Sequence, residues 1–332
     1  MNESNESNVL DELLEQRYRT VLRLLPRSYR AEREEEMVAA FVEGGEVPDE
    51  EYPRPGWGEI ASVLALSTRV RLGGAGAIPR FVAWGAAVRL VATLGLAFHA
   101  AAGAFTLASL AFAAPGSMTR PLGVLAAALW AAAFVLLMRG HVRTAKPVAF
   151  AAGAATLAEL AAWQIAGGLF VPLDVVSPVL SVVVPLAALF AGFHRDVPPV
   201  RRAWLPTVLP LAAGLVLRAV VLALLAPALG RVPLLWPWVD LMGLATVLLV
   251  VAGIVCLARR VPAYVPLALA ILGTLMLPSR LSVVDNSYLS LGASALWVSS
   301  VGQCVALVVM VTVLAVAGFR GLPSVRQGRA VV

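Results

Sequence analysis

Long apolar runs separated by short polar stretches fill the chain from Phe81 onward. A helix that crosses a bilayer needs about 20 mostly apolar residues. The runs that meet this need are predicted at 85–113, 121–138, 147–170, 175–193, 204–226, 236–258, 262–279 and 291–319. The pattern predicts an all-α fold in which residues 81–320 form a polytopic transmembrane bundle of about 8 spans.

The first 76 residues follow another pattern, in which apolar residues recur every three or four positions, as on one face of an amphipathic helix. A first helix is predicted over 9–25, with Ser7 or Asn8 as its cap. It ends before Pro26, because proline lacks an N–H and disfavours helical backbone at the preceding residue. A second helix is predicted from the cap Ser28, and an acidic loop with prolines follows it.

A third helix is predicted after this loop, from apolar residues at helical spacing: Trp57, Ile60, Val63, Leu64 and Val70. Gly73, Gly74 and Gly76 then form a flexible join to the first span. Three helices of this size can build one small core. We therefore expect a three-helix domain over residues 1–76, on the cytoplasmic side of the membrane.

Composition and charge separate the same two parts. The chain is 60% hydrophobic and 14% charged, whereas about 25% of the residues in soluble domains are charged. Residues 1–80 hold 15 acidic residues against 10 arginines, while residues 81–332 hold 5 against 16 lysines and arginines. The basic excess lies in short segments between apolar runs, where it orients helices in the bilayer, so we expect no direct nucleic-acid binding.

The basic residues between the runs also predict the topology. Cytoplasmic segments of bacterial membrane proteins carry most of the Lys and Arg. One predicted side has only Arg120, Arg231 and Arg280. The other side has Arg139, Arg143, Lys146, Arg195, Arg201, Arg202, Arg259, Arg260, Arg320, Arg326 and Arg329. This asymmetry places both termini in the cytoplasm (N-in/C-in), with residues 321–332 as a basic cytoplasmic tail.

Residues 22–41, LRLLPRSYRAEREEEMVAAF, combine a Leu-rich helix end, a proline, a Tyr-Arg pair and an acidic helix that contains Met. This stretch resembles the helical module of the HAAS or permease-prefix type at the N-terminus of many actinobacterial polytopic membrane proteins. The similarity covers roughly the first 75 residues. It implies a regulatory or complex-forming role, since such modules accompany permease subunits or occur alongside PadR-like transcription regulators, and it implies no catalytic residues.

Two charged residues inside the predicted spans, Glu159 and Arg218, are the main site candidates. A charge at mid-bilayer costs about 2.5–3.5 kcal/mol on insertion scales. Measured from the inner ends of their predicted helices, Glu159 lies about 18 Å and Arg218 about 21 Å deep. The similar depths predict an intramembrane polar pair, which either fixes the helix register or forms a substrate or proton site.

Three other polar residues are secondary candidates. Asp240, near an outer end, either is another partner for Arg218 or meets water; His99 is expected to be hydrogen-bonded within the packing, and Arg89 to reach the headgroups. The sequence contains no H-E-x-x-H, G-x-S-x-G or P-loop motif and no metal-ligand spacing. We therefore expect no enzymatic activity, cofactor or metal.

These observations favour a non-enzymatic integral membrane protein of the bacterial cell (inner) membrane, whose cytoplasmic domain docks a soluble partner in signalling or complex formation. The expected docking surface consists of Arg27, Tyr29, Arg30, Glu34 and Glu35, where alternating charges indicate a solvated face. The alternative is a transporter or permease subunit with its site around Glu159 and Arg218. A water-accessible pair would favour the transporter, and a dry pair would favour the protein that docks a soluble partner.

Overall fold

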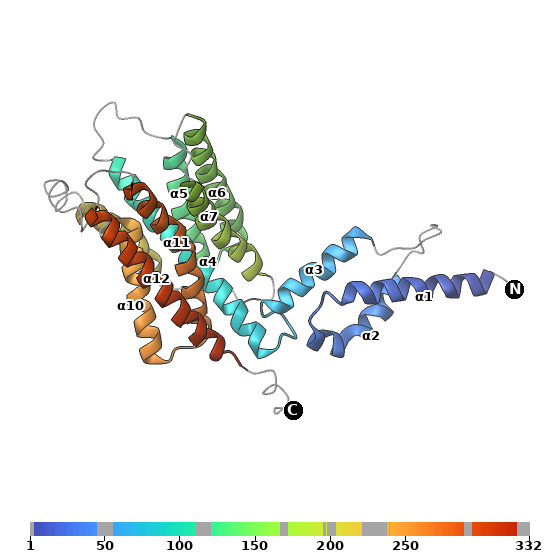
Figure 1. Ribbon diagram of the computed structural model, residues 1–332. Coiled ribbons are helices and arrows are strands. Elements are labelled where there is room, and N and C mark those ends of the chain that lie inside the picture. The colour runs from blue at the N-terminus through green and yellow to red at the C-terminus, as the bar shows by residue number, and fades with distance from the viewer. Residues whose placement is uncertain are drawn as a thin grey trace. The chain divides into compact units, whose positions relative to one another are not determined.

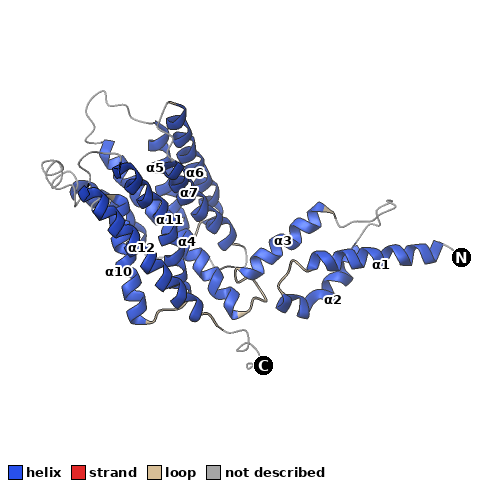
Figure 2. Cartoon of the chain, viewed as in Figure 1, coloured by secondary structure: helices blue, strands red, loops and turns tan. Residues whose placement is uncertain are grey.

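The computed structural model describes residues 3–44, 56–110, 121–166, 172–194, 197, 204–220, 238, 240–288 and 294–323. Every regular element in these ranges is a helix (Figure 2), which confirms the predicted all-α fold for this part of the chain. The chain divides into two compact units. Unit 1 consists of Met1–Ala86 with Pro323–Val332, and unit 2 of Ala87–Leu322. Most of the predicted basic tail, residues 324–332, lies outside the described residues.

Unit 1 contains helices α1 (Glu3–Leu22), α2 (Arg27–Gly44) and α3 (Trp57–Arg71), labelled in Figure 1. They share one core, which consists of Tyr18, Leu22, Leu25, Val38 and Val63. The Ser67 hydroxyl and the Arg71 guanidinium both donate to the carbonyl of Leu24, at 2.7 and 3.1 Å. These bonds attach α3 to the turn between α1 and α2.

The helix ends in unit 1 correct part of the sequence prediction. Pro26 separates α1 from α2 as predicted. The predicted caps are wrong, because Ser7 and Asn8 lie inside α1 and Ser28 lies inside α2. Acidic residues such as Glu3 are favourable near the positive N-terminal end of a helix dipole, so the polar start of the chain extends α1 instead of preceding it.

Helix α3 does not bury the whole stripe that its sequence predicts. Its buried residues are Val63, Ser67 and Val70. The side chains of Trp57 and Leu64 are instead 87% and 48% exposed. Trp57, Ala61 and Leu64 recur at the spacing of one helix face and are all exposed. We call these three residues the α3 outer face.

The predicted flexible join is a defined turn. Gly73 has φ +84°, a conformation that favours glycine. The N–H of Gly74 donates to the carbonyl of Arg69 at 2.8 Å, and that of Gly73 to the carbonyl of Val70 at 3.2 Å, as in a Schellman motif. A Cβ at Gly73 would lie 3.0 Å from the Cα of Val82. Glycine is therefore needed here for the shape of the turn.

Unit 2 contains the long apolar helices, the first of which begins in unit 1. They are α4 (Pro79–Leu110), α5 (Pro121–Met138), α6 (Val142–Ile165), α7 (Pro172–Gly192), α8 (Trp204–Val220), α10 (Leu241–Arg259), α11 (Tyr264–Tyr288) and α12 (Ser294–Arg320). Among the described residues, 7 helices are long and apolar enough to cross a membrane. The predicted multi-pass membrane protein is confirmed at this level.

The fifth predicted span, 204–226, corresponds to α8, which has 17 described residues with a shorter apolar stretch at Thr207–Leu217. Residues 221–226 lie outside the described residues. The count of about eight spans and the N-in/C-in topology therefore stay predictions. Within unit 2, α6 packs on α5 and α7, α11 packs on α7, α10 and α12, and α10 also contacts α12. Figure 1 shows α5, α6 and α7 side by side, with α10 and α12 beyond α11.

Helix α11 corrects the predicted end of the span 262–279, because residues 280–288 are helical and do not form part of a connection between spans. It continues from Tyr264 to Tyr288, and Pro278 lies inside it. Proline is tolerated within membrane helices, because neighbouring helices and local adjustments satisfy the backbone groups that it frees. Arg280, predicted to lie in an outer loop, is therefore on a helix, and its side chain is 1% exposed.

Candidate functional site

Arg280 is the largest fully buried side chain of the described residues. Its Nη2 donates to Oδ2 of Asp240 at 2.9 Å, and its Nη1 donates to Oε1 of Gln303 at 3.1 Å. Asp240 is the N-cap of α10, and its Oδ1 accepts from the N–H of Gly243 at 2.6 Å. A cation from α11 thus joins the start of α10 to α12.

A second polar contact is made from the same turn of α11. The hydroxyl of Ser282, two residues after Arg280 on α11, donates to Oδ1 of Asp174 in the first turn of α7. Both carboxylates therefore lie at helix N-termini, where the dipole favours negative charge. We call Asp174, Asp240, Arg280, Ser282 and Gln303 the polar cap. It contains two acidic groups and one cation from four helices.

Two buried hydroxyls adjoin the polar cap. Ser299 and Ser300 precede Gln303 by about one turn on α12 and are 4% and 0% exposed. Neither hydroxyl has a hydrogen-bond partner among the residues whose positions are described. Buried polar groups in folded proteins usually have partners. This end of unit 2 therefore has hydrogen-bonding capacity beyond the contacts of the polar cap.

Sequence reasoning missed the polar cap because Pro278 followed by polar residues is also typical of a loop. A signal was present nonetheless. Asp240 lies near the same predicted end of the bundle as Arg280, and a carboxylate and an arginine at similar depth in a membrane usually pair. The structure pairs Asp240 with Arg280, a partner that the sequence did not predict for it.

His99 of α4 joins three neighbouring helices. Its ring stacks on Trp130 of α5, with centroids 4.3 Å apart, and its Nε2 lies 2.8 Å from the carbonyl oxygen of Ser181 in α7. Pro185 lies four residues after Ser181 and has no N–H to bond that carbonyl. Since a carbonyl can only accept, Nε2 is the donor, and His99 replaces the helix hydrogen bond that Pro185 removes.

The C-terminal end of α7 receives two basic side chains. Lys146 of α6 donates from Nζ to the carbonyl of Phe193 at 2.7 Å and to that of Phe190 at 3.3 Å. Arg89 of α4 packs its stem at Gly192, and its buried Nη1 has no hydrogen-bond partner in the described part of the chain. Cations are favourable at the negative end of a helix dipole, so these contacts stabilise this helix end.

The structure describes half of the predicted pair. Glu159 is half-buried on α6, and a Cβ at Gly123 of α5 would lie 2.6 Å from its Oε2. The side chain of Arg218 on α8 lies outside the described side chains. Helix α6 begins at Val142, five residues before the prediction, so Glu159 lies about 25 Å from that end and Arg218 about 21 Å along α8. The pairing stays a prediction.

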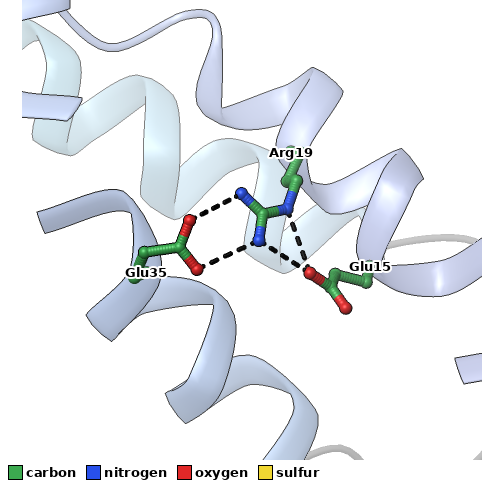
Figure 3. A network of polar contacts seen from close by, with 3 residues as sticks. All are labelled: Glu15, Arg19 and Glu35. Atoms are coloured by element: carbon green, nitrogen blue, oxygen red, sulfur yellow. Dashed lines mark hydrogen bonds and ion pairs between the residues drawn. The ribbon is translucent and has the colours of Figure 1, made fainter. Parts of the chain in front are cut away.

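In unit 1 the main polar contact centres on Arg19 (Figure 3). Its guanidinium bonds both carboxylate oxygens of Glu35, at 2.9 and 3.0 Å, and also Oε1 of Glu15, at 2.7 Å. These hydrogen bonds from Arg19 lower the pKa of the Glu35 carboxyl below its ordinary value of 4.5, and they raise the pKa of Arg19. The contact ties α2 to α1.

The predicted docking residues on α2 have different surroundings. Glu35 is engaged by Arg19, and Tyr29 packs against the unit 1 core. Arg30 and Glu34 are half-buried, whereas Arg27 is exposed. Tyr29 and Glu35 therefore already have contacts inside unit 1.

No group of three or more His, Cys, Asp or Glu that could hold a metal ion occurs within the described ranges. The chain matches no protein-family model, no curated protein sequence and no solved structure.

Proposed function

We propose that this chain is a non-enzymatic multi-pass protein of the bacterial cell membrane, whose unit 1 lies in the cytoplasm and docks a soluble partner protein. One observation carries the proposal: unit 1 has its own core and still exposes the α3 outer face. The Trp57 side chain is 87% exposed, and tryptophan is among the residue types that contribute most to protein interfaces. A partner that covers Trp57 and Leu64 would remove their apolar surface from water.

Two sequence features support the cytoplasmic side and the regulatory role. Because Arg280 is a buried residue of α11 and not of a loop, the arginines that the sequence predicts for the outer loops fall from three to two, Arg120 and Arg231, which strengthens the predicted positive-inside asymmetry. The resemblance of residues 22–41 to HAAS or permease-prefix modules implies partner binding. In this proposal, the α3 outer face forms the centre of the docking surface, and the exposed Arg27 contributes charge on α2.

The test is affinity capture of the full-length protein from native membranes in mild detergent, followed by quantitative mass spectrometry. The samples are the wild type, a chain that lacks residues 1–76, and the double variant Trp57→Ala, Leu64→Ser. We expect one soluble protein to be lost from both altered samples.

The matched control is Leu13→Ser, an apolar-to-polar change at an exposed position of α1. It should retain the partner. If the wild type and the Trp57→Ala, Leu64→Ser variant capture the same soluble proteins, docking through the α3 outer face is wrong.

A second candidate function is a transporter or permease subunit, and the polar groups buried among the helices of unit 2 favour it. Such residues in membrane proteins often mark substrate or ion pathways. The test is Glu159→Cys in a chain whose Cys256 and Cys304 are replaced by Ala, treated with a membrane-impermeant thiol reagent. Modification at Glu159→Cys supports a water-accessible path, whereas protection in folded protein, with full reaction after denaturation, contradicts a path at Glu159.

A further inference from the structure

Unit 2 contains a half-open apolar pocket of about 580 Å³, called the cavity below. Residues of α4, α7, α8, α10 and α11 line it, and among the described lining residues only His99, Ser177 and Ser181 are polar. Pockets of about 300–1,000 Å³ hold ligands of drug-like size. Because burial of a polar group without a partner is costly, the body of the occupant must be apolar.

The cavity is elongated along the helices. Both Leu241 and Ala252 of α10 line it, and eleven residues of helix correspond to about 16 Å. The helices around it, apart from α8, are among those long enough to cross a membrane. Hydrocarbon chains from the bilayer are therefore the apolar molecules that surround it, and an extended chain fits its length.

The two ends of the cavity differ. At one end, the lining residues Ser177, Leu241 and Met276 lie three, one and four residues from Asp174, Asp240 and Arg280 of the polar cap. Residues one helical turn apart lie on the same helix face. The opposite end, where α10 and α11 join through a short connection, is lined by apolar residues that include Leu94, Pro185 and Leu269. An occupant that matches this cavity is apolar along its length and polar at one end.

We propose that this cavity binds one hydrocarbon chain of an amphiphile, with the polar head at the polar cap. Transfer of a chain from lipid into the protein gains no hydrophobic free energy, because lipid tails are themselves apolar. Selective binding must then come from close packing and from polar contacts of the head. Near this end, the buried hydroxyls of Ser299 and Ser300 on α12 do not line the cavity and have no partner among the described residues.

The test uses the full-length protein in detergent and palmitic acid that carries a photoreactive diazirine, either next to the carboxyl group or near the chain end. Cross-linked peptides are mapped by mass spectrometry. The probe labelled near the carboxyl group should mark the Met242 and Met276 end, and the other probe the Leu209 and Leu269 end. The reverse pattern, or unsaturable labelling over all lipid-facing surfaces, would overturn the proposal.

Unlabelled competitors identify the source of the chain. Competition by palmitic acid alone supports a free fatty acid, and competition by phosphatidylcholine supports the acyl chain of a bilayer lipid. Hexadecane has the chain without the head and should compete at least about tenfold less well, because it makes no polar contact. Equal competition by hexadecane would contradict the role of the polar cap.

Two cavity-filling variants are used so that misfolding of either one does not decide the test. Ala245→Phe on α10 and Ala213→Phe on α8 fill the cavity from different walls, and each should reduce labelling about tenfold because the ring occupies space that the hydrocarbon chain needs. Val251→Phe is the matched control, because this residue is exposed on α10 and does not line the cavity. Unchanged labelling in both filled variants, with their elution as folded protein confirmed, would overturn the proposal.

Discussion

The contact between Asp240 and Arg280 leads to a prediction about two substitutions, each of which removes one of the two charges. Asp240→Asn keeps the capping oxygen at the start of α10, since Asn is also a good N-cap, but it removes the charge that faces Arg280. Arg280→Met keeps much of the apolar stem and removes the cation. The side chain of Arg280 is 1% exposed, whereas that of Asp240 is 29% exposed. We therefore expect Asp240→Asn to be the more destabilising change.

The expected losses in the free energy of unfolding depend on which charged group each variant leaves without its partner. Removal of one member of a buried ion pair costs about 3–5 kcal/mol, and water near Asp240 places the cost of Asp240→Asn toward about 3 kcal/mol. Arg280→Met leaves a carboxylate that water reaches and that still accepts from Gly243, so about 1–2 kcal/mol is expected. The double variant should be no worse than Asp240→Asn, because it no longer buries an uncompensated charge.

The assay is unfolding of the full-length protein by SDS in mixed micelles, with the change in free energy of unfolding compared between variants. Asp174→Asn is the comparison, because Asn keeps an oxygen that can accept from the neutral hydroxyl of Ser282. It should cost about 1 kcal/mol or less. A larger loss for Arg280→Met than for Asp240→Asn, or additive losses in the double variant, would refute the reasoning.

Three further predictions concern packing and charge. His99→Phe should lower the free energy of unfolding by about 1–3 kcal/mol in the same SDS assay, because it leaves the buried carbonyl of Ser181 without a donor. The loss should be smaller in a Pro185→Ala background, where the helix N–H is restored. An equal loss in both backgrounds would refute the coupling of His99 to Pro185. Gly95→Ala should destabilise by about 1–3 kcal/mol, because its Cβ would lie 2.5 Å from Cγ of Pro185, whereas Gly302→Ala, with nothing within 4 Å of its Cβ, should not. The pKa of Glu35 is lowered in the folded protein, so its contribution is present above about pH 4.5 and is lost as the pH falls through the folded pKa. Hydrogen exchange of α1 and α2 in Glu35→Gln should exceed wild type at pH 6 and converge with it toward pH 3.

The sequence by itself determined the class of the protein and the approximate position of its helices. Apolar runs long enough to span a bilayer follow from composition along the chain, and each predicted run overlaps a helix over most of its described residues. Pro26 also marked the break between the first two helices. Such features are local, because length, hydropathy and the missing N–H of proline act within a few residues.

Only the tertiary structure decided which polar groups meet. Arg280 follows a proline in a stretch that also fits a loop, and its contact with Asp240 depends on how α11 packs beside α10. In α3, Val63 and Leu64 are equally apolar, yet only Val63 faces the shared core, because the positions of α1 and α2 determine which face is covered. His99 and Pro185 are likewise coupled by the packing of α4 on α7, since the carbonyl that proline frees lies more than eighty residues from its donor.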